Sequence, residues 1–209
     1  MKHPGHGDSS QCIAGRRGSC GHHYLRPWLV AVAIAWLFLG LPSMHGQHAK
    51  PTEYEVKATY LYNFSRFVEW PAKVTQVQSS SFVICVLGKD PFGPALNTIL
   101  AHEATSGKSI EAQRIPTVQD AVHCRVLFIS SSENTRLKQI LTTLGDASVL
   151  TVSELPEFTQ RGGMVQFVSE GSRVRFEVNL ASAEHAGLTM SSELLKVAVN
   201  VRRSTRPGD

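Results

Sequence analysis

The strongest hydrophobic pattern in this chain is an apolar run that ends at a glycine, Phe82-Val83-Ile84-Cys85-Val86-Leu87-Gly88. No polar residue alternates with the apolar ones, so the run predicts a strand buried on both faces, as in a parallel or mixed sheet. Its length and its Val and Ile residues favour a strand over the alternative, a short buried helix. Turn residues follow the run, and we expect a helix at residues 93–102.

Strand and helix patterns alternate over the middle of the chain. We expect three further strands, at residues 111–115, 125–129 and 148–152, of which the last two contain apolar runs. The spacing of leucine and isoleucine predicts a helix between the last two strands, and Gly145 ends it. This alternation indicates an α/β fold: a single-domain sandwich with a mixed, mostly parallel sheet flanked by helices.

Pairs of polar residues mark the expected starts of helices. Thr52 and Glu55 form a capping box that opens the first helix of the domain, and Pro71 ends that helix. Trp70, at its end, is either a lid on the core or one wall of a ligand pocket. Two later starts are expected: Thr117 with Asp120 caps a short helix, and Ser130 with Glu133 forms a second capping box.

Residues 164–168 and 173–178 alternate between apolar and polar positions around a short turn, which predicts a β-hairpin. One face of its second strand is apolar. The other face carries two arginines, a carboxylate and an amide, which are candidates for binding a partner or a ligand: Arg173, Arg175, Glu177 and Asn179. The alternative is an ordinary solvated sheet face. Two closing helices are expected at 181–186 and 192–201, with a frayed tail at 204–209.

An uncharged stretch near the N-terminus predicts export. Residues 28–41 contain no charge, and four basic residues against one acid precede them. A basic segment before an apolar stretch of this length is typical of a secretory signal and is short for a membrane span. We therefore expect residues 1–49 to be a signal peptide, with an uncleaved N-terminal anchor as the alternative. Residues 50–203 then form the domain.

Export changes what the composition means. From residue 50 onward there are 17 basic and 16 acidic residues, so the net charge there is +1 and gives no basis for nucleic-acid binding. Two of the four cysteines, Cys85 and Cys124, also follow the leader. A pair in an oxidising compartment is a candidate disulfide, with two buried thiols as the alternative.

Motifs for catalysis are missing from the sequence. There is no G-x-S-x-G, and the three histidines that follow the leader are scattered, at His102, His123 and His185. No group of His, Cys and Asp with metal-ligand spacing follows the leader. We expect no enzyme activity, no cofactor and no metal.

Short motifs spread over residues 54–201 resemble the YfiR-like family, in the same order. Each motif is weak alone, and the ordered set is specific. They are Tyr62-Asn63-Phe64, Phe67-Val68-Glu69-Trp70-Pro71, the run 82–88 with Asp90-Pro91-Phe92-Gly93, Cys124 to Ser130, Gly162-Gly163-Met164, Arg175 to Asn179, Gly187-Leu188 and Ser191 to Leu195.

This resemblance implies a periplasmic α/β protein with a bridge from Cys85 to Cys124. Better-known members restrain an inner-membrane diguanylate cyclase by contacting its periplasmic sensor domain. An outer-membrane lipoprotein relieves that restraint by sequestering the repressor. Some members carry a second cysteine pair near the last hairpin, and this chain has none there, so redox control through that pair does not carry over.

Two classes of function follow. In the first, the protein is a periplasmic regulator that holds down cyclic-di-GMP synthesis through a membrane sensor partner. In the second, it is a stand-alone periplasmic protein that binds a small aromatic or nucleotide ligand near residues 88–90 and 130–131, where the strands end. The sequence leaves open the partner's identity and a homodimer.

Overall fold

The computed structural model describes residues 50–72, 81–103 and 109–203. The expected signal segment (1–49), most of the polar linker before the first long strand (73–80) and the expected tail (204–209) lie outside the described residues. No helix among the described residues is long and apolar enough to cross a bilayer.

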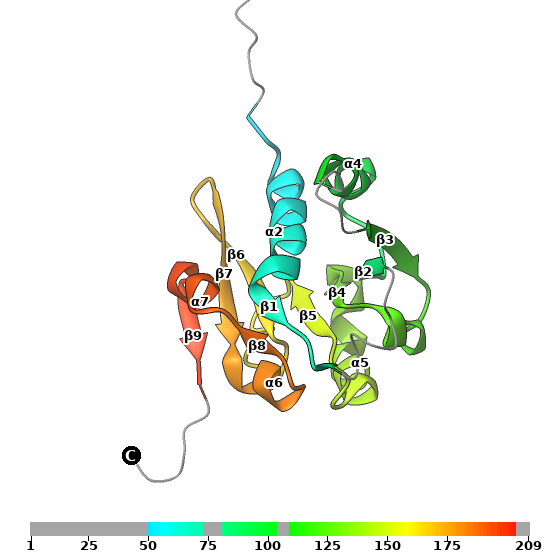
Figure 1. The fold of residues 1–209 in the computed structure, drawn as a ribbon, viewed down its shortest axis with the longest axis vertical. Coiled ribbons are helices and arrows are strands. Elements are labelled where there is room, and N and C mark those ends of the chain that lie inside the picture. The colour runs from blue at the N-terminus through cyan, green and yellow to red at the C-terminus, as the bar shows by residue number, and fades with distance from the viewer. Residues whose placement is uncertain (1–49, 73–80, 104–108, 204–209) are drawn as a thin grey trace, which may run out of the picture. The chain divides into compact units, whose positions relative to one another are not determined.

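A seven-stranded sheet organises the domain, in the order β3-β2-β4-β5-β6-β7-β9 (Figure 1). Neighbouring strands from β3 to β6 pair in parallel, β7 is antiparallel to β6, and β9 is parallel to β7. The expected fold class, a mostly parallel α/β sheet flanked by helices, is confirmed. The strands are β2 (Ser81–Leu87), β3 (Ser109–Ile115), β4 (Val126–Ile129), β5 (Leu150–Ser153), β6 (Val165–Glu170), β7 (Arg173–Asn179) and β9 (Asn200–Arg202).

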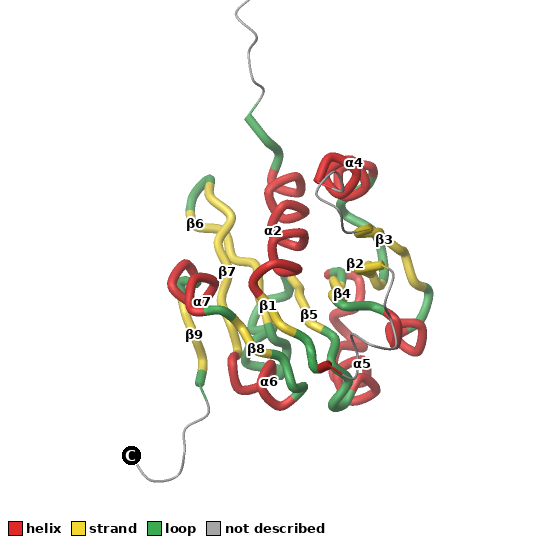
Figure 2. Tube along the Cα trace, in the orientation of Figure 1, coloured by secondary structure: helices red, strands yellow, loops and turns green. Residues whose placement is uncertain are grey.

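Helices cover both faces of this sheet (Figure 2). On one face, α2 (Glu53–Phe67) and α4 (Pro94–Glu103) bury a cluster that includes Phe64, Phe128 and Phe176. Two later helices, α6 (Leu180–His185) and α7 (Ser192–Val197), add side chains to the same cluster. The other face packs under α5 (Leu137–Leu144) and two 3-10 helices, η2 (Val118–His123) and η3 (Ser131–Arg136). Strands buried on both faces explain the uninterrupted apolar run of β2.

The expected helix starts are only partly right. Thr52 and Glu55 form the capping box, with each side chain bonded to the other residue's backbone N–H. The second expected box is wrong, because the Ser130 hydroxyl accepts from the N–H of Ser132 and the Glu133 carboxylate turns to Arg136. Thr117 makes no side-chain cap either, since its hydroxyl donates to the carboxylate of Asp120.

The end of the domain also differs from the expected pattern. The last helix, expected at 192–201, stops at Val197, and residues 200–202 form strand β9. A short antiparallel pair, β1 (Val68–Glu69) with β8 (Thr189–Met190), was not expected either, and it ends α2 before Pro71. β-Branched residues around 197–201 favour an extended chain, and the outer edge of β7 offers it hydrogen-bond partners.

Candidate functional site

The two cysteines after the leader are joined. Cys85 lies in the middle of β2 and Cys124 two residues before the start of β4, with their Cα atoms 5.8 Å apart. Both side chains are buried, at 0% and 2% exposure. The imidazole of His123 lies beside them, with the three possible ligand atoms within 4.8 Å of one another, but sulfurs bonded to each other are not thiolate ligands.

The polar face of β7 lies on the side of the sheet opposite α2. Arg173 pairs across the hairpin with Glu170, Arg175 with Val168, and Glu177 with Gln166. Residues paired across an antiparallel hairpin point to the same face, so these six side chains share one face of the sheet. The four candidate residues of β7 therefore share a surface, as the alternation predicted.

Each candidate residue of that face has a different environment. Arg173 is exposed, whereas Arg175 is half-buried and donates from Nη2 to the carbonyl of Val197 in α7, at 3.5 Å. Glu177 accepts a hydrogen bond from the hydroxyl of the buried Thr159. Asn179 is structural, because its Oδ1 caps α6 and its Nδ2 donates to the carbonyl of Thr159.

Trp70 is separate from this face. Its ring meets that of Phe82 edge to face, with centroids 5.2 Å apart, and packs against the core beneath α2. Its buried Nε1 has no hydrogen-bond partner within residues 50–72, 81–103 and 109–203. This packing corresponds to a lid on the core. A lid tryptophan usually donates its indole N–H to a backbone carbonyl, and no such bond forms among the described residues.

The edge where β2 and β4 end is nearly filled. The N–H of Lys89 donates to the hydroxyl of Ser132, and a Cβ on Gly88, at φ +88°, would overlap the side chains of Ser132 and Glu133. A small cavity of about 120 Å³ lies nearby, beside Glu133. This volume is below the range of roughly 300–1,000 Å³ that is usual for small-molecule sites, and the ligand site that the sequence suggested at this edge stays a prediction.

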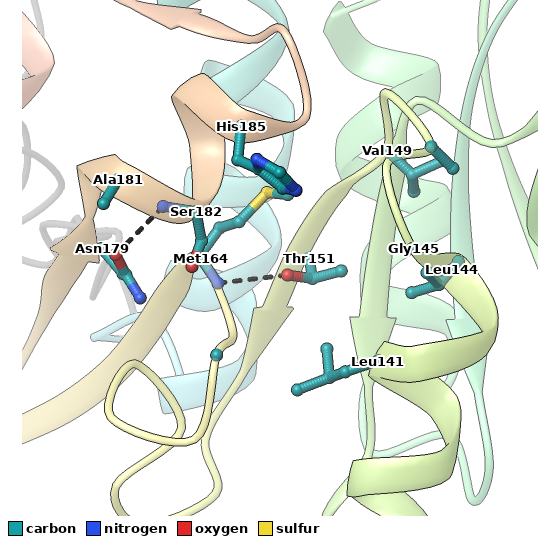
Figure 3. Close-up of a pocket in the computed structure, with 12 residues that line it drawn as sticks. Leu141, Leu144, Gly145, Val149, Thr151, Met164, Asn179, Ala181, Ser182 and His185 are labelled. Carbon is teal, nitrogen blue, oxygen red and sulfur yellow. Dashed lines mark hydrogen bonds between the residues drawn. The ribbon is translucent and has the colours of Figure 1, made fainter. Parts of the chain in front are cut away.

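A larger cavity lies at the opposite ends of the strands, between α5 and α6, and we call it the α5–α6 pocket (Figure 3). Its volume is about 390 Å³. Figure 3 shows apolar side chains on the α5 side, polar ones on the α6 side, and Thr151 and Met164 between them. Of the candidate residues only Asn179 lines it. The lining residues are Leu141, Leu144, Gly145, Ala147, Val149, Thr151, Gly162, Met164, Asn179, Ala181, Ser182 and His185.

Sequence reasoning missed this pocket because its walls come from four separate segments. The apolar residues of α5 look like core positions, and those of α6 look like a surface helix. One signal was present: Thr151 is a polar residue inside an apolar strand, and it is 2% exposed.

The fold and these sites define a disulfide-linked α/β domain with a charged sheet face and several surface cavities, among them the α5–α6 pocket and one of about 560 Å³ that Arg173 and Arg175 help to line. The chain belongs to the YfiR/HmsC-like family, whose model matches residues 54–199. Members of this family are periplasmic regulators of diguanylate cyclases.

Two solved structures are similar to this chain at 11% identity. One is a conserved domain protein from Vibrio cholerae O1 biovar eltor str. N16961, with a TM-score of 0.49 over 72% of this chain and 60% of that chain. The other is the ABC domain from Streptococcus pneumonia in complex with L-Trp, with a TM-score of 0.41 over 61% and 58% of the two chains. The present chain thus spans about 60% of the length of the Vibrio protein.

Proposed function

We propose that this protein is exported by its N-terminal segment and restrains a membrane-bound diguanylate cyclase by binding the cyclase's periplasmic sensor domain. The observation that carries the proposal is the family match over residues 54–199. The buried Cys85–Cys124 bridge supports it, because disulfides form and persist in oxidising compartments. An outer-membrane lipoprotein that sequesters the repressor would relieve the restraint.

The docking surface in this proposal is the polar face of β7 together with α7. The hydrogen bond from Arg175 to the carbonyl of Val197 joins the two elements at the β9 edge of the sheet. Val197, whose carbonyl accepts from Arg175, is 54% exposed, so an exposed apolar residue adjoins Arg175. Arginine next to exposed apolar area is typical of the residues that carry binding energy at interfaces.

Restraint then follows from the preference of this surface for one conformation of the sensor. A partner shifts a conformational equilibrium only by the difference between its affinities for the two states. If the surface binds the inactive sensor tenfold more tightly, the active population falls by up to about tenfold at saturation. No chemical step by this protein is required.

Charge reversal tests the docking surface. Arg175→Glu should reduce capture of the cyclase from solubilised membranes by at least tenfold, because it places a negative charge beside Glu177 and Glu170. Lys138→Glu is the matched control, since Lys138 is an exposed cation on α5, an element outside the proposed surface of β7 and α7. Equal capture by the two variants would refute this surface, and no capture by the unmodified protein would refute the proposal.

A further inference from the structure

The α5–α6 pocket has the size of a small-molecule site, at the lower end of the usual range of roughly 300–1,000 Å³. We propose that it binds a small aliphatic carboxylate, with the hydrocarbon chain against α5 and the carboxylate between Thr151 and α6. This inference does not rest on the regulatory proposal, because it concerns a different part of the molecule and a different kind of partner.

The α5 wall accommodates a hydrocarbon chain. Leu141, Leu144 and Val149 line it, and Gly162 faces it without a side chain. A Cβ on Gly162 would lie 3.7 Å from the Cδ1 of Leu141, so the absence of a side chain keeps this wall open. Met164 is unbranched and flexible, and such side chains adjust to irregular apolar shapes.

Thr151 supplies a buried hydrogen-bond donor. Its hydroxyl oxygen accepts from the N–H of Met164 at 3.1 Å (Figure 3). The hydroxyl proton has no acceptor among the residues that the structure describes, and Thr151 is buried, with 2% exposure. A buried donor of this kind favours a ligand that brings an acceptor atom.

The α6 wall adds a second hydroxyl, that of Ser182, which can donate to a ligand. The Asn179 side chain is engaged at both ends, since Oδ1 accepts from the N–H of Ser182 and Nδ2 donates to Thr159. The Ser182 hydroxyl and the imidazole of His185 remain at the rim. No carboxylate lines the pocket, and the nearby Asp146 is held by Nε2 of His185 at 2.8 Å. An acceptor-rich head group therefore fits this wall.

Other ligand classes fit less well. No lysine or arginine lines the pocket, so a phosphate group would find no cation to pair with. No aromatic ring lines it, so a planar aromatic ligand would find no stacking partner. An aliphatic carboxylate carries a single negative charge, which the hydroxyls of Thr151 and Ser182 and water at the exposed rim near His185 can solvate, and it needs no aromatic ring.

Calorimetry on protein purified after expression of the full chain tests the inference. Hexanoate and octanoate are the probes, and octylamine and octanol are the controls with the same hydrocarbon chain. We expect saturable 1:1 binding of octanoate, with each control binding at least tenfold more weakly. Absence of saturable carboxylate binding, or equal binding of octanol, would overturn the proposal.

Two variants locate the site. Thr151→Val keeps the shape but removes the donor, and Ala181→Trp fills the pocket from its half-exposed rim. Each should weaken octanoate binding at least tenfold. Thr159→Val is the matched control, because Thr159 is equally buried and hydrogen-bonded but does not line the pocket, and it should change binding less than twofold.

Circular dichroism shows whether each variant is folded before binding is compared. If Thr151→Val does not fold, Ala181→Trp alone decides the outcome, since its side chain extends from the surface. Binding that survives in the folded pocket variants would place the ligand elsewhere and overturn the assignment. Because no cyclase is present in this assay, its failure leaves the regulatory proposal unaffected.

Discussion

At the scale of single residues, the least expected feature is a buried lysine in α2. Lys57 is 3% exposed, and its Nζ lies 2.6 Å from carboxylate oxygens of both Glu53 and Glu154, over the ring of Tyr54. Burial acts to lower the pKa of Lys57, but the hydrogen bonds to Glu154 and Glu53 outweigh it and raise the pKa. The ammonium group thus ties the first turn of α2 to the end of β5.

Replacing this lysine should destabilise the domain. Removing one partner of a buried pair costs about 3–5 kcal/mol. Glu154 keeps 18% exposure, so Lys57→Met should cost about 3 kcal/mol, the lower end of that range. Because the folded pKa is raised, the stabilisation is complete below the usual value of 10.5 and is lost as pH rises through the folded pKa.

Urea unfolding of both proteins as a function of pH measures this effect. The difference in free energy of unfolding should stay constant from neutral pH to about pH 10 and shrink above it. A difference that disappears already at neutral pH would contradict the role of the charged pair.

Gly163 gives a second residue-scale prediction. A Cβ at this position would overlap the ring of Phe158, which is fully buried. Gly163→Ala should therefore lower the free energy of unfolding by about 1–3 kcal/mol, the usual cost of overpacking. Adding Phe158→Leu makes room for the methyl group, so the double variant should lose less than the sum of the single losses. Additive losses would mean that the two groups do not meet.

At the scale of elements, β9 shows how the sheet is completed. Residues 200–202 pair in parallel with β7, and the N–H of Val199 donates to the carbonyl of Phe176 at 2.9 Å. These hydrogen bonds cover the outer edge of β7 next to its polar face. They also hold α7 beside the hairpin.

Val199→Pro should detach this strand, because proline has no N–H to donate to Phe176. We expect a loss of roughly 1–3 kcal/mol in the free energy of unfolding. Amide hydrogen exchange should become faster in residues 197–202 and remain slow in β2 and β4. Unchanged exchange in 197–202 would show that β9 does not depend on this bond.

The elements differ in how far the sequence could predict them. The strands β2, β4 and β7 were predictable because each carries a continuous or alternating pattern over at least four residues. β1, β8 and β9 span two or three residues, which is too short to show a repeating pattern of apolar and polar residues. They form because the edge of a neighbouring strand offers backbone hydrogen-bond partners. The box at Ser130 failed because Glu133 found a stronger partner in Arg136.

The candidate sites follow the same rule. The polar face of β7 could be predicted, because alternation along one strand assigns its residues to a face. The α5–α6 pocket could not, because it depends on how helices at 137–144 and 180–185 pack around β5.

At the scale of the whole molecule, the disulfide links β2 to the start of β4 across 39 residues that include α4, β3 and η2. On the chain-entropy account, a loop of this length contributes about 4 kcal/mol. The double variant Cys85→Ser, Cys124→Ser should lose about that much, measured by urea unfolding under oxidising conditions. The same loss is expected for the unmodified protein after reduction, and a loss below 1 kcal/mol in both cases would contradict the role of the bridge.

Stability and the proposed regulation depend on different parts of the molecule. The disulfide holds the α/β half together, and the hairpin with α7 presents the proposed docking surface on the other half of the sheet. Loss of the bridge should then weaken restraint by depleting folded protein, whereas Arg175→Glu should weaken it without depleting the protein.

The cellular level of cyclic-di-GMP tests the central claim most directly. It should be measured in cells that express the sensor cyclase, with the gene for this protein intact, deleted, or replaced by Arg175→Glu or Lys138→Glu. The account predicts a rise on deletion, a similar rise with Arg175→Glu at unchanged protein level, and no rise with Lys138→Glu. An unchanged level after deletion, with the cyclase present and active, would contradict it.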